Sequence, residues 1–268
     1  MSSVIDICVI PAAGEGTRWL PLSNFVPKEM IPFGRRPVIE WSVKEAADAG
    51  CRKIIFVINK KKKVIKDYLL EHKKEYPKVD FYFVYQNKPL GIVDSILKAE
   101  KYIKNKPFIL VFPDTPSTYK VSPIKQMMDT YNLSDKESYI LNFAQYPKYN
   151  VLSYGECLLK KRKDGLFDVL HICPRPKVIG KSHHPGNKFR LAGRMIFPID
   201  SIKLFKKVFK QLKSKKPDDA DVLTLAIALK KQVLGVNTKG MTYEVGNVYS
   251  YMESYLKLNS IKKQQKYW

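Results

Sequence analysis

The chain has 268 residues, of which 45% are hydrophobic, so it is far longer than a peptide and can bury the core of one large domain or two modest ones. Its 48 lysines and arginines against 25 aspartates and glutamates give a formal charge of +23, which points to nucleic acid, a membrane surface or a phosphorylated metabolite as partner. Only eight of the basic residues are arginine, which disfavours nucleic acid because bidentate recognition of base edges prefers arginine.

Cysteine spacing and the length of the apolar runs indicate the compartment. Cys8, Cys51, Cys157 and Cys173 show no CxxC spacing, so neither a zinc site nor a disulfide framework is predicted, and a reducing setting fits them. Lysine, proline or glycine interrupts every apolar run before membrane-spanning length, and no basic segment followed by an apolar run opens the sequence. We therefore expect a soluble, cytoplasmic protein with no membrane partner.

The first half of the chain alternates short apolar runs with segments of helical period, a pattern typical of a parallel sheet covered by helices. Strands are predicted over residues 5–11, 53–59, 79–86 and 108–112. Helices are predicted over residues 37–49 and 91–101, with another opening at 60–63. Asp114 follows the fourth strand at its carboxyl end, the edge at which open parallel sheets bind ligands.

The second half is less regular. Short strands are predicted within residues 151–170 around a turn at 163–165, and longer ones over 188–197 and 232–237. Helices are predicted over residues 200–213, 219–231 and 248–258. The lysines between residues 203 and 216 alternate with apolar side chains at helical spacing, which favours an amphipathic helix with a solvated basic face over a nucleic-acid patch.

The loop after the first strand reads Pro11-Ala-Ala-Gly-Glu-Gly-Thr-Arg18. Its two glycines let the backbone approach a ligand, its N–H groups can point at phosphate oxygens or a base edge, and Arg18 adds a guanidinium. The spacing matches neither GxGxxG nor GxxxxGK[ST], which disfavours a dinucleotide fold and a P-loop. For the loop alone, a glycine turn without a ligand is an equal alternative.

A lysine on a stiff segment follows this loop. Lys28 lies between Pro27 and Pro32, which restrict the backbone around it to extended conformations. A lysine held near Arg18 would place two positive charges on one polyphosphate. The alternative is an ordinary surface lysine.

The pairing of AAGxGTR with PKEMxP resembles the sugar-phosphate nucleotidyltransferases, and PKEM is most similar to the bacterial UTP–glucose-1-phosphate uridylyltransferases. The resemblance continues in the family's order over nearly the whole chain. Further matching segments are Val84-Tyr85-Gln86 with Gly91, Val111 to Asp114, Pro176-Lys177, Leu191 to Arg194, Leu223-Thr224 and Val245-Gly246-Asn247.

This resemblance implies a fold and a reaction. The fold would be α/β, a Rossmann-like, three-layer, GT-A-like nucleotidyltransferase with a mixed, mainly parallel central sheet. We expect a single domain over residues 1–268, with a nucleotide-binding half at 1–120 and a sugar-binding, metal-completing half at 121–268. The implied reaction makes a UDP-glucose-like nucleotide sugar and pyrophosphate from UTP and a hexose 1-phosphate by in-line attack on the α-phosphorus. Such an enzyme acts by positioning and charge stabilisation, because the attacking phosphate is already an anion.

The resemblance also implies site residues. Nucleotide-binding roles fall on Ala12, Ala13, Gly14, Glu15, Gly16, Gln86, Gly91 and Asp114. Catalytic roles fall on Arg18, Lys28 and Arg175, and sugar-binding roles on Gly155, Arg175, Lys177 and Gly193. Mg2+ would be held by Asp114 and Glu244. The amide of Gln86 suits the pyrimidine edge because it both donates and accepts hydrogen bonds.

Three positions depart from the family pattern. Glu244 stands where the family has an aspartate, Pro174 where it has a sugar-binding glutamate, and Leu225 where it has an acidic residue at a helix start. Glutamate is longer by one methylene, and proline cannot accept hydrogen bonds from sugar hydroxyls through a side chain. These departures predict altered sugar specificity or weakened catalysis.

Several alternatives follow. Gln86 and Gly91 would accept thymine as well as uracil, so a dTTP-dependent thymidylyltransferase is the nearest alternative enzyme. A catalytically impaired nucleotide-binding paralogue is another, motivated by the three departures. We expect UTP or dTTP and a sugar 1-phosphate as ligands, no nucleic acid, and assembly into a homo-oligomer, a dimer or tetramer.

Overall fold

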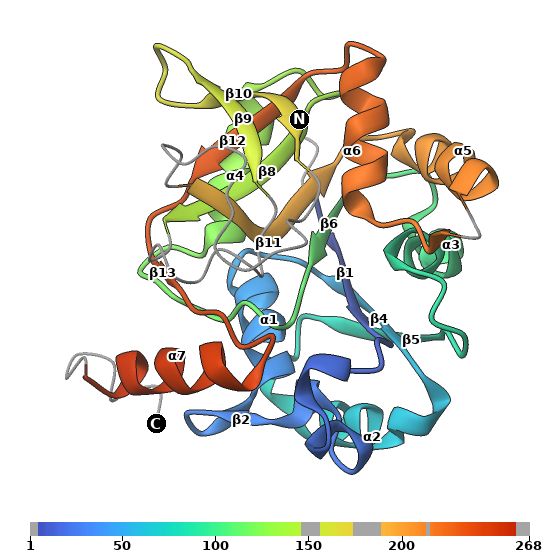
Figure 1. The fold of residues 1–268 in the computed structure, drawn as a ribbon, viewed down its shortest axis with the longest axis vertical. Coiled ribbons are helices and arrows are strands. Elements are labelled where there is room, and N and C mark those ends of the chain that lie inside the picture. Colours follow the sequence, from blue (N-terminus) through green and yellow to red (C-terminus); the bar gives the residue numbers. More distant parts are fainter. Residues whose placement is uncertain (1–4, 146–155, 174–188, 213–214, 261–268) are drawn as a thin grey trace.

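The computed structural model describes residues 5–145, 156–173, 189–212 and 215–260. Figure 1 shows a central sheet with helices on both faces. Nine strands form the sheet in the order β5, β4, β1, β6, β11, β8, β12, β10, β9. Strands β11 and β10 run against both of their neighbours, and every other pairing is parallel. Over the described residues the sheet is therefore mixed and largely parallel, as predicted.

The strands of this sheet are β1 (Ile7–Ala12), β4 (Lys53–Ile58), β5 (Asp80–Tyr85), β6 (Phe108–Val111), β8 (Tyr139–Gln145), β9 (Cys157–Lys161), β10 (Phe167–Ile172), β11 (Phe189–Phe197) and β12 (Val233–Asn237). Two short pairs lie outside it, β2 (Pro32–Phe33) with β3 (Arg36–Pro37) and β7 (Ser117–Thr118) with β13 (Met241–Thr242). The 3-10 helices are η1 (Thr17–Trp19), η2 (Leu22–Asn24), η3 (Lys28–Met30), η4 (Lys60–Lys62) and η5 (His72–Glu75).

Each face of the sheet packs against three helices. One hydrophobic cluster joins the sheet to α3 (Ile92–Ile103), α5 (Ser201–Leu212) and α6 (Asp219–Ala228), which group together in Figure 1. A second cluster joins the opposite face to α1 (Val38–Asp48), α2 (Lys63–Glu71) and α4 (Pro123–Leu133). A third, smaller cluster seats α7 (Val248–Ser260) against α1 and the β2–β3 hairpin. The result is the predicted three-layer arrangement.

Most predicted elements are confirmed within a few residues of their bounds. The basic segment after residue 200 forms α5, which buries Ile202, Phe205 and Val208 while its lysines stay exposed, as the amphipathic interpretation required. Leu225, one of the departures from the family pattern, packs against the first hydrophobic cluster. In the part of the chain that the structure describes, no helix combines the length and hydropathy that would cross a membrane.

Two elements, α4 and β8, lie in the stretch for which the sequence pattern led to no prediction. Ser122 caps α4 by accepting a hydrogen bond from the Lys125 N–H at 3.4 Å, and Pro123 occupies its first turn. Strand β8 carries a fully buried Asn142, whose side-chain Oδ1 accepts from the Thr238 hydroxyl at 2.9 Å. A polar residue inside a short apolar run weakens the strand signal, because its burial depends on partners that only the tertiary structure supplies.

Backbone pairing brings two distant segments to the carboxyl edge of the sheet. Strand β6 lies beside β1 and ends at Val111, so the loop that carries Asp114 emerges next to the glycine-containing loop. Beyond the β13–β7 pairing, the Val245 N–H donates to the Asp114 carbonyl at 3.0 Å. Residues 244 and 114 therefore lie on adjacent backbone segments.

Candidate active site

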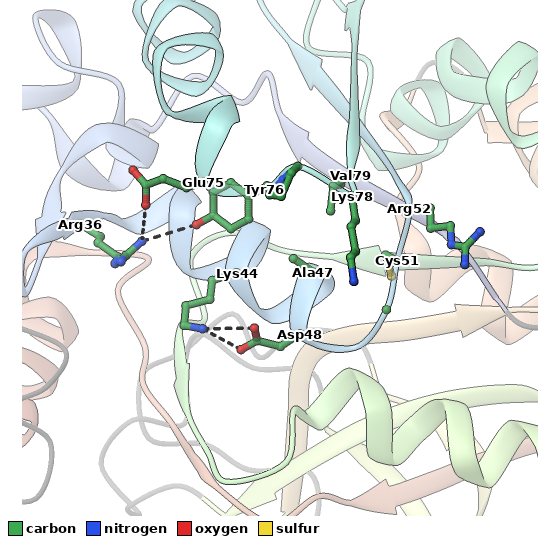
Figure 2. A pocket seen from close by; sticks show the side chains of 12 residues that line it. Arg36, Lys44, Ala47, Asp48, Cys51, Arg52, Glu75, Tyr76, Lys78 and Val79 are labelled. Atoms are coloured by element: carbon green, nitrogen blue, oxygen red, sulfur yellow. Dashed lines mark hydrogen bonds and ion pairs between the residues drawn. The ribbon is translucent and has the colours of Figure 1, made fainter.

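Two cavities are prominent on the described part of the chain. The one in Figure 2, of about 460 Å³, lies at the amino ends of β4 and β5, away from the edge at which the predicted site residues gather. Several of its charged groups pair with one another: Lys44 with Asp48 at 2.9 Å, and Arg36 with Glu75 at 3.7 Å. Its position and this internal pairing make it the weaker candidate.

The other cavity, of about 650 Å³, lies at the carboxyl ends of β1, β5 and β6. It is lined by Ala13, Gly14, Arg18, Lys28, Gln86, Gly91, Asp114, Gly193 and Glu244 among the predicted site residues. Ala12, Glu15 and Gly16 lie next to this wall in the chain but do not line it. The predicted Gly155, Arg175 and Lys177, and Pro174 with them, fall outside the described residues.

Asp114 is the centre of charge in this cavity. Its Oδ2 lies 2.7 Å from the Lys28 Nζ and 3.7 Å from the Arg18 guanidinium. Burial by itself would raise the pKa of this carboxyl, but the charge and hydrogen bond of Lys28 and the charge of Arg18 outweigh burial, so the pKa lies below its usual value. Burial would lower the pKa of Lys28, yet Asp114 and Glu29 raise it above its usual value. Both groups are therefore ionised at neutral pH.

Glu244 supplies a second carboxylate. It is buried, and its Oε1 accepts the Gly246 N–H at 3.0 Å. A side chain at Gly246 would collide with this oxygen and approach the Arg18 guanidinium at 3.2 Å, so Arg18 and Glu244 flank the same glycine. The described residues contain no cluster of three or more potential metal ligands. Two carboxylates on adjacent backbone segments nevertheless suit a hard cation that completes its shell with substrate phosphates and water.

The glycine-containing loop accepts hydrogen bonds from a lysine, Lys62, that was not among the predicted site residues. The Lys62 Nζ donates to the Gly14 carbonyl at 2.5 Å, to the Ala12 carbonyl at 3.1 Å and to the Glu29 Oε2 at 2.8 Å. Lys62 follows β4 in η4, whose first turn is fixed by the Asn59 side chain accepting from the Lys61 N–H at 2.9 Å. The one sequence feature that could have indicated Lys62 is the position of the lysine run 60–63, directly after a predicted strand and so at the carboxyl edge of the sheet.

Gln86 lies on the cavity wall, but its amide is engaged inside its own loop. The amide nitrogen donates to the Gly91 carbonyl and to Asp94, both at 2.9 Å, and the amide oxygen accepts from the Ser95 hydroxyl at 2.8 Å. Both N–H donors are used, and the oxygen keeps one lone pair. Gly91 has a φ of +94°, and a Cβ there would overlap the Pro217 carbonyl oxygen, so only glycine fits this close approach to the segment before α6.

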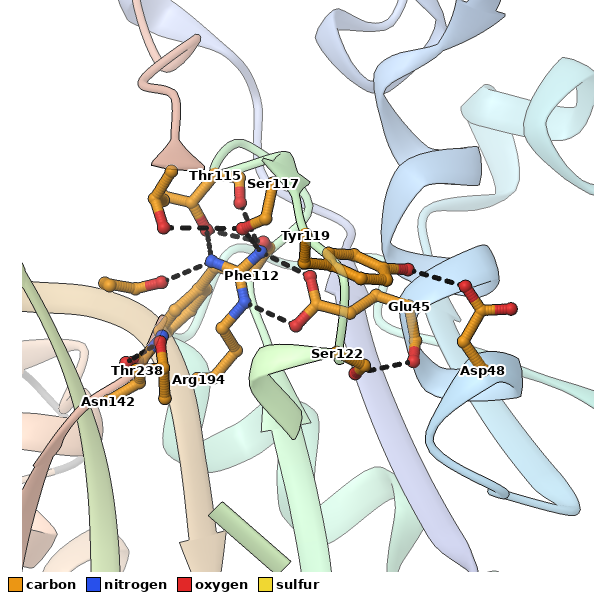
Figure 3. A network of polar contacts seen from close by, with 12 residues as sticks. Glu45, Asp48, Phe112, Thr115, Ser117, Tyr119, Ser122, Asn142, Arg194 and Thr238 are labelled. Carbon is orange, nitrogen blue, oxygen red and sulfur yellow. Dashed lines mark hydrogen bonds and ion pairs between the residues drawn. The ribbon is translucent and has the colours of Figure 1, made fainter. Parts of the chain in front are cut away.

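A buried arginine braces the loop that carries Asp114. Figure 3 shows Arg194 of β11 beside Glu45 of α1. The Arg194 Nε donates to the Glu45 Oε1 at 2.9 Å, and its Nη2 donates to the Oε2 at 2.6 Å. The same guanidinium donates to the Thr115 carbonyl at 2.5 Å, the Thr115 hydroxyl at 3.1 Å and the Ser117 hydroxyl at 2.8 Å. Because Thr115 directly follows Asp114, this network joins α1 and β11 to the charged centre of the cavity. The sequence marked Arg194 as part of a motif but indicated no partner.

Gly193 lines the cavity next to this brace. Its φ is +71°, and a Cβ would lie 2.5 Å from the Thr115 hydroxyl. Its carbonyl accepts the Phe112 N–H at 2.8 Å. The glycine therefore allows β11 to approach the loop after β6 closely, whatever contact it makes with a ligand.

Comparison with known protein families shows which family has this arrangement. The nucleotidyl transferase family matches residues 7–260, which include every element that lines the cavity. The chain belongs to the nucleotidyl transferase family.

Among curated relatives, the chain is similar to the UTP–glucose-1-phosphate uridylyltransferase of Streptococcus pneumoniae, with 28% identity over 282 residues, 95% of this chain and 90% of that protein. A solved UDP-glucose pyrophosphorylase complexed with UDP-glucose superposes with a TM-score of 0.81 at 25% identity, covering 96% of this chain and 99% of the other. A UTP-bound UGPase from Acinetobacter baumannii shares the fold, with a TM-score of 0.77, 24% identity, and coverage of 98% of this chain and 97% of the other.

The family resemblance and the three-layer nucleotidyltransferase fold are thereby confirmed. This nucleotidyl transferase brings together the predicted Arg18, Lys28 and Asp114 in one charged group. Sequence reasoning missed four residues that make polar contacts around this group, of which Glu29 and Thr115 also line the cavity: Lys62, Glu29, Glu45 and Thr115.

Proposed function

We propose that this nucleotidyl transferase makes UDP-glucose and pyrophosphate from UTP and glucose 1-phosphate. The observation that carries the proposal is the cavity in which the glycine-containing loop, Arg18, Lys28, Asp114 and Glu244 converge. Its volume of about 650 Å³ suits a nucleotide-sized ligand. Relatives that span nearly the whole chain bear the name of this activity, and one superposed structure holds UDP-glucose.

In this reaction an oxygen of the sugar 1-phosphate forms a bond to the α-phosphorus of UTP. The bond from that phosphorus to the oxygen bridging to the β-phosphate breaks, and pyrophosphate leaves with the electron pair. Arg18 and Lys28 are placed to stabilise the negative charge on the triphosphate through this step. Arg175, Lys177, Gly155 and Gly193 are the residues we assign to the sugar phosphate and sugar.

Asp114 and Glu244 would hold Mg2+ in this proposal. Bound there, the ion supplies charge neutralisation on the phosphate oxygens and on the departing pyrophosphate. Before a ligand binds, Lys28 satisfies Asp114 at 2.7 Å. With ligand present, the same ammonium is free to contact a phosphate while Asp114 serves the cation.

Selection of the pyrimidine falls to Gln86 and Gly91. Because both Gln86 N–H groups are used inside the loop, we assign its amide oxygen to accept the N3–H of uracil through the remaining lone pair. A cytosine ring carries no N3–H, so this arrangement disfavours CTP. Thymine presents the same N3–H, so dTTP is the closest competitor.

The test is pyrophosphate release with UTP, dTTP, CTP and ATP, each with glucose 1-phosphate and other hexose 1-phosphates in the presence of Mg2+. We expect the highest kcat/KM for UTP with glucose 1-phosphate. The variant Asp114→Ala should lose metal-dependent turnover while keeping its far-UV circular dichroism. The control, Asp129→Ala, removes an exposed aspartate that pairs with Lys125 on α4 and should leave turnover unchanged. UTP binding without turnover of any pair would contradict the proposal and favour an impaired paralogue.

A further inference from the structure

The strongest feature that the proposed chemistry does not use is Lys62 beneath the glycine-containing loop. We infer that Lys62 is a positioning residue that turns the N–H groups of this loop toward the cavity and so prepares it for the triphosphate. The inference rests on the proposed function for the identity of the ligand. It assigns to Lys62 an ordering of the loop that none of the residues proposed to act in the reaction provides.

All three hydrogens of the Lys62 ammonium have acceptors. They are the carbonyls of Ala12 and Gly14 and the carboxylate of Glu29, at 3.1, 2.5 and 2.8 Å. The two carbonyls are two residues apart, so one charged group fixes alternate peptide units of the loop. A saturated ammonium of this kind specifies a geometry, because each bond constrains a different part of the chain.

The consequence for the ligand follows from peptide geometry. In a trans peptide the carbonyl and the following N–H point in opposite directions, and the described chain has its cis bond elsewhere, at Leu20–Pro21. With the carbonyls of Ala12 and Gly14 directed at Lys62, the N–H groups of Ala13 and Glu15 point away from it. Within the described residues, neither N–H has a backbone acceptor. Backbone N–H groups without an acceptor can bind an anion such as a phosphate, and Ala13 lines the cavity.

Glu29 links Lys62 to the segment that carries Lys28. Its side chain is 1% exposed, and Lys62, itself 12% exposed, is the cation that pairs with it. Glu29 directly follows Lys28 in η3, and the Lys28 ammonium contacts Asp114. The ion pair thus joins the loop after β1 to the segment that presents Lys28. An unpaired buried carboxylate would be costly, so the pair resists separation.

The neighbouring lysines show that this role belongs to one position. Lys61 and Lys63 flank Lys62 in the sequence and are both exposed, and Lys63 pairs with Asp67 on α2 at 3.7 Å. Lys61 is therefore a matched control, because it has the same charge and lies one residue away on the same 3-10 helix.

The test compares Lys62→Met and Lys61→Met with the unmodified protein. Binding of UTP and of inorganic tripolyphosphate is measured by calorimetry, and turnover is measured with UTP and glucose 1-phosphate. Lys62→Met should raise both dissociation constants about tenfold or more, because the loop must then be ordered at the moment of binding. Since Lys62 touches no reacting atom, kcat at saturating UTP should change less than about threefold and the KM of the sugar phosphate should be unchanged. Lys61→Met should stay within about twofold throughout.

A third variant separates positioning from simple charge. Glu29→Met removes a negative charge beside the cavity, so an effect of charge alone would tighten the binding of an anion. Loss of the Glu29 anchor should instead weaken UTP and tripolyphosphate binding. Far-UV circular dichroism establishes that each variant is folded, and Glu29→Met provides the test should Lys62→Met not fold.

The outcomes are distinct. Weakened binding in Lys62→Met and Glu29→Met with an unaffected Lys61→Met supports the inference. Equal effects in the two lysine variants, or tighter binding in Glu29→Met, overturns it. If the unmodified protein binds tripolyphosphate but does not turn over UTP, the proposed function fails while the tripolyphosphate measurements still decide the role of Lys62. If it does not bind tripolyphosphate, the inference fails as well.

Discussion

Replacing Arg194 with methionine removes the most completely buried charge in the described chain that contacts the Asp114 loop. Arg194 is 0% exposed and Glu45 1% exposed, so the substitution leaves a carboxylate without its partner inside the protein. Breaking one side of a buried ion pair costs about 3–5 kcal/mol. The carbonyls of Ala192 and Thr115 also lose donors at 2.6 and 2.5 Å. At roughly 2–4 °C per kcal/mol for a chain of this size, the melting temperature should fall by roughly 10 °C.

The free energy of unfolding is measured by urea titration followed by circular dichroism, for Arg194→Met, Glu45→Leu and the double variant. The double variant should recover part of the loss, because an apolar pair replaces the unpaired charge and leaves only the unsatisfied carbonyls, at about 1–3 kcal/mol. Arg162→Met is the matched control. Its side chain is 35% exposed and its guanidinium lies 3.1 Å from Asp168, so its loss should cost about 1 kcal/mol or less.

Two results would refute this reasoning. The first is a loss of about 1 kcal/mol or less in Arg194→Met, which would mean that the pair behaves like a surface salt bridge. The second is a double variant less stable than either single variant, which would mean that the unpaired charge is not the source of the cost. Turnover should fall in Arg194→Met even where the protein is folded, because Thr115 directly follows Asp114 and loses its brace.

Three further predictions follow from the cavity. Gly91→Ala should destabilise the protein by roughly 3 kcal/mol or more, because it adds overlap with the Pro217 carbonyl to the strain of a φ of +94°. Gly165→Ala is the control: at a φ of +85° with open space around it, it should show only the backbone strain of about 1–3 kcal/mol. Equal losses of stability in thermal unfolding would contradict the contact with Pro217. Glu244→Gln keeps an acceptor for the Gly246 N–H but removes a ligand charge, so the Mg2+ concentration at half-maximal turnover should rise severalfold, and an unchanged Mg2+ titration would remove Glu244 from the metal site. The pKa of Asp114 is lowered in the folded protein, so its contribution to stability is present above the unfolded value near 4 and is lost as the pH falls through the folded value. The stability difference between the unmodified protein and Asp114→Asn should therefore be constant from about pH 5 to 8 and should shrink as the pH is lowered further; a difference that grows as the pH is lowered would refute the assignment.

The local elements and the charged motifs could be predicted from the sequence. Apolar runs and helical periods are local properties, so the strands from β1 to β6 in the main sheet and the helices α1, α3 and α5 could be predicted within a few residues. The glycines and Arg18 after a buried strand are also a local pattern, and they indicated a candidate phosphate-binding loop with a ligand-free glycine turn as an equal alternative. The carboxyl-edge position of Asp114 also followed, because parallel strands present their ends at one edge.

Which of these groups contact one another depends on the tertiary structure. Arg194 and Glu45 are 149 residues apart in the chain, and Lys62 and Gly14 are 48 apart, so no periodicity links them. Strand β8, with its buried Asn142, is defined by its pairings with β11 and β12. The charge of +23 follows from the composition, but burial in the folded protein decides which basic side chains have fixed partners. The lysines of α5 remain in water, whereas Lys28 and Lys62 are withdrawn from it and must be matched by carboxylates and carbonyls, which gives them defined positions around the cavity.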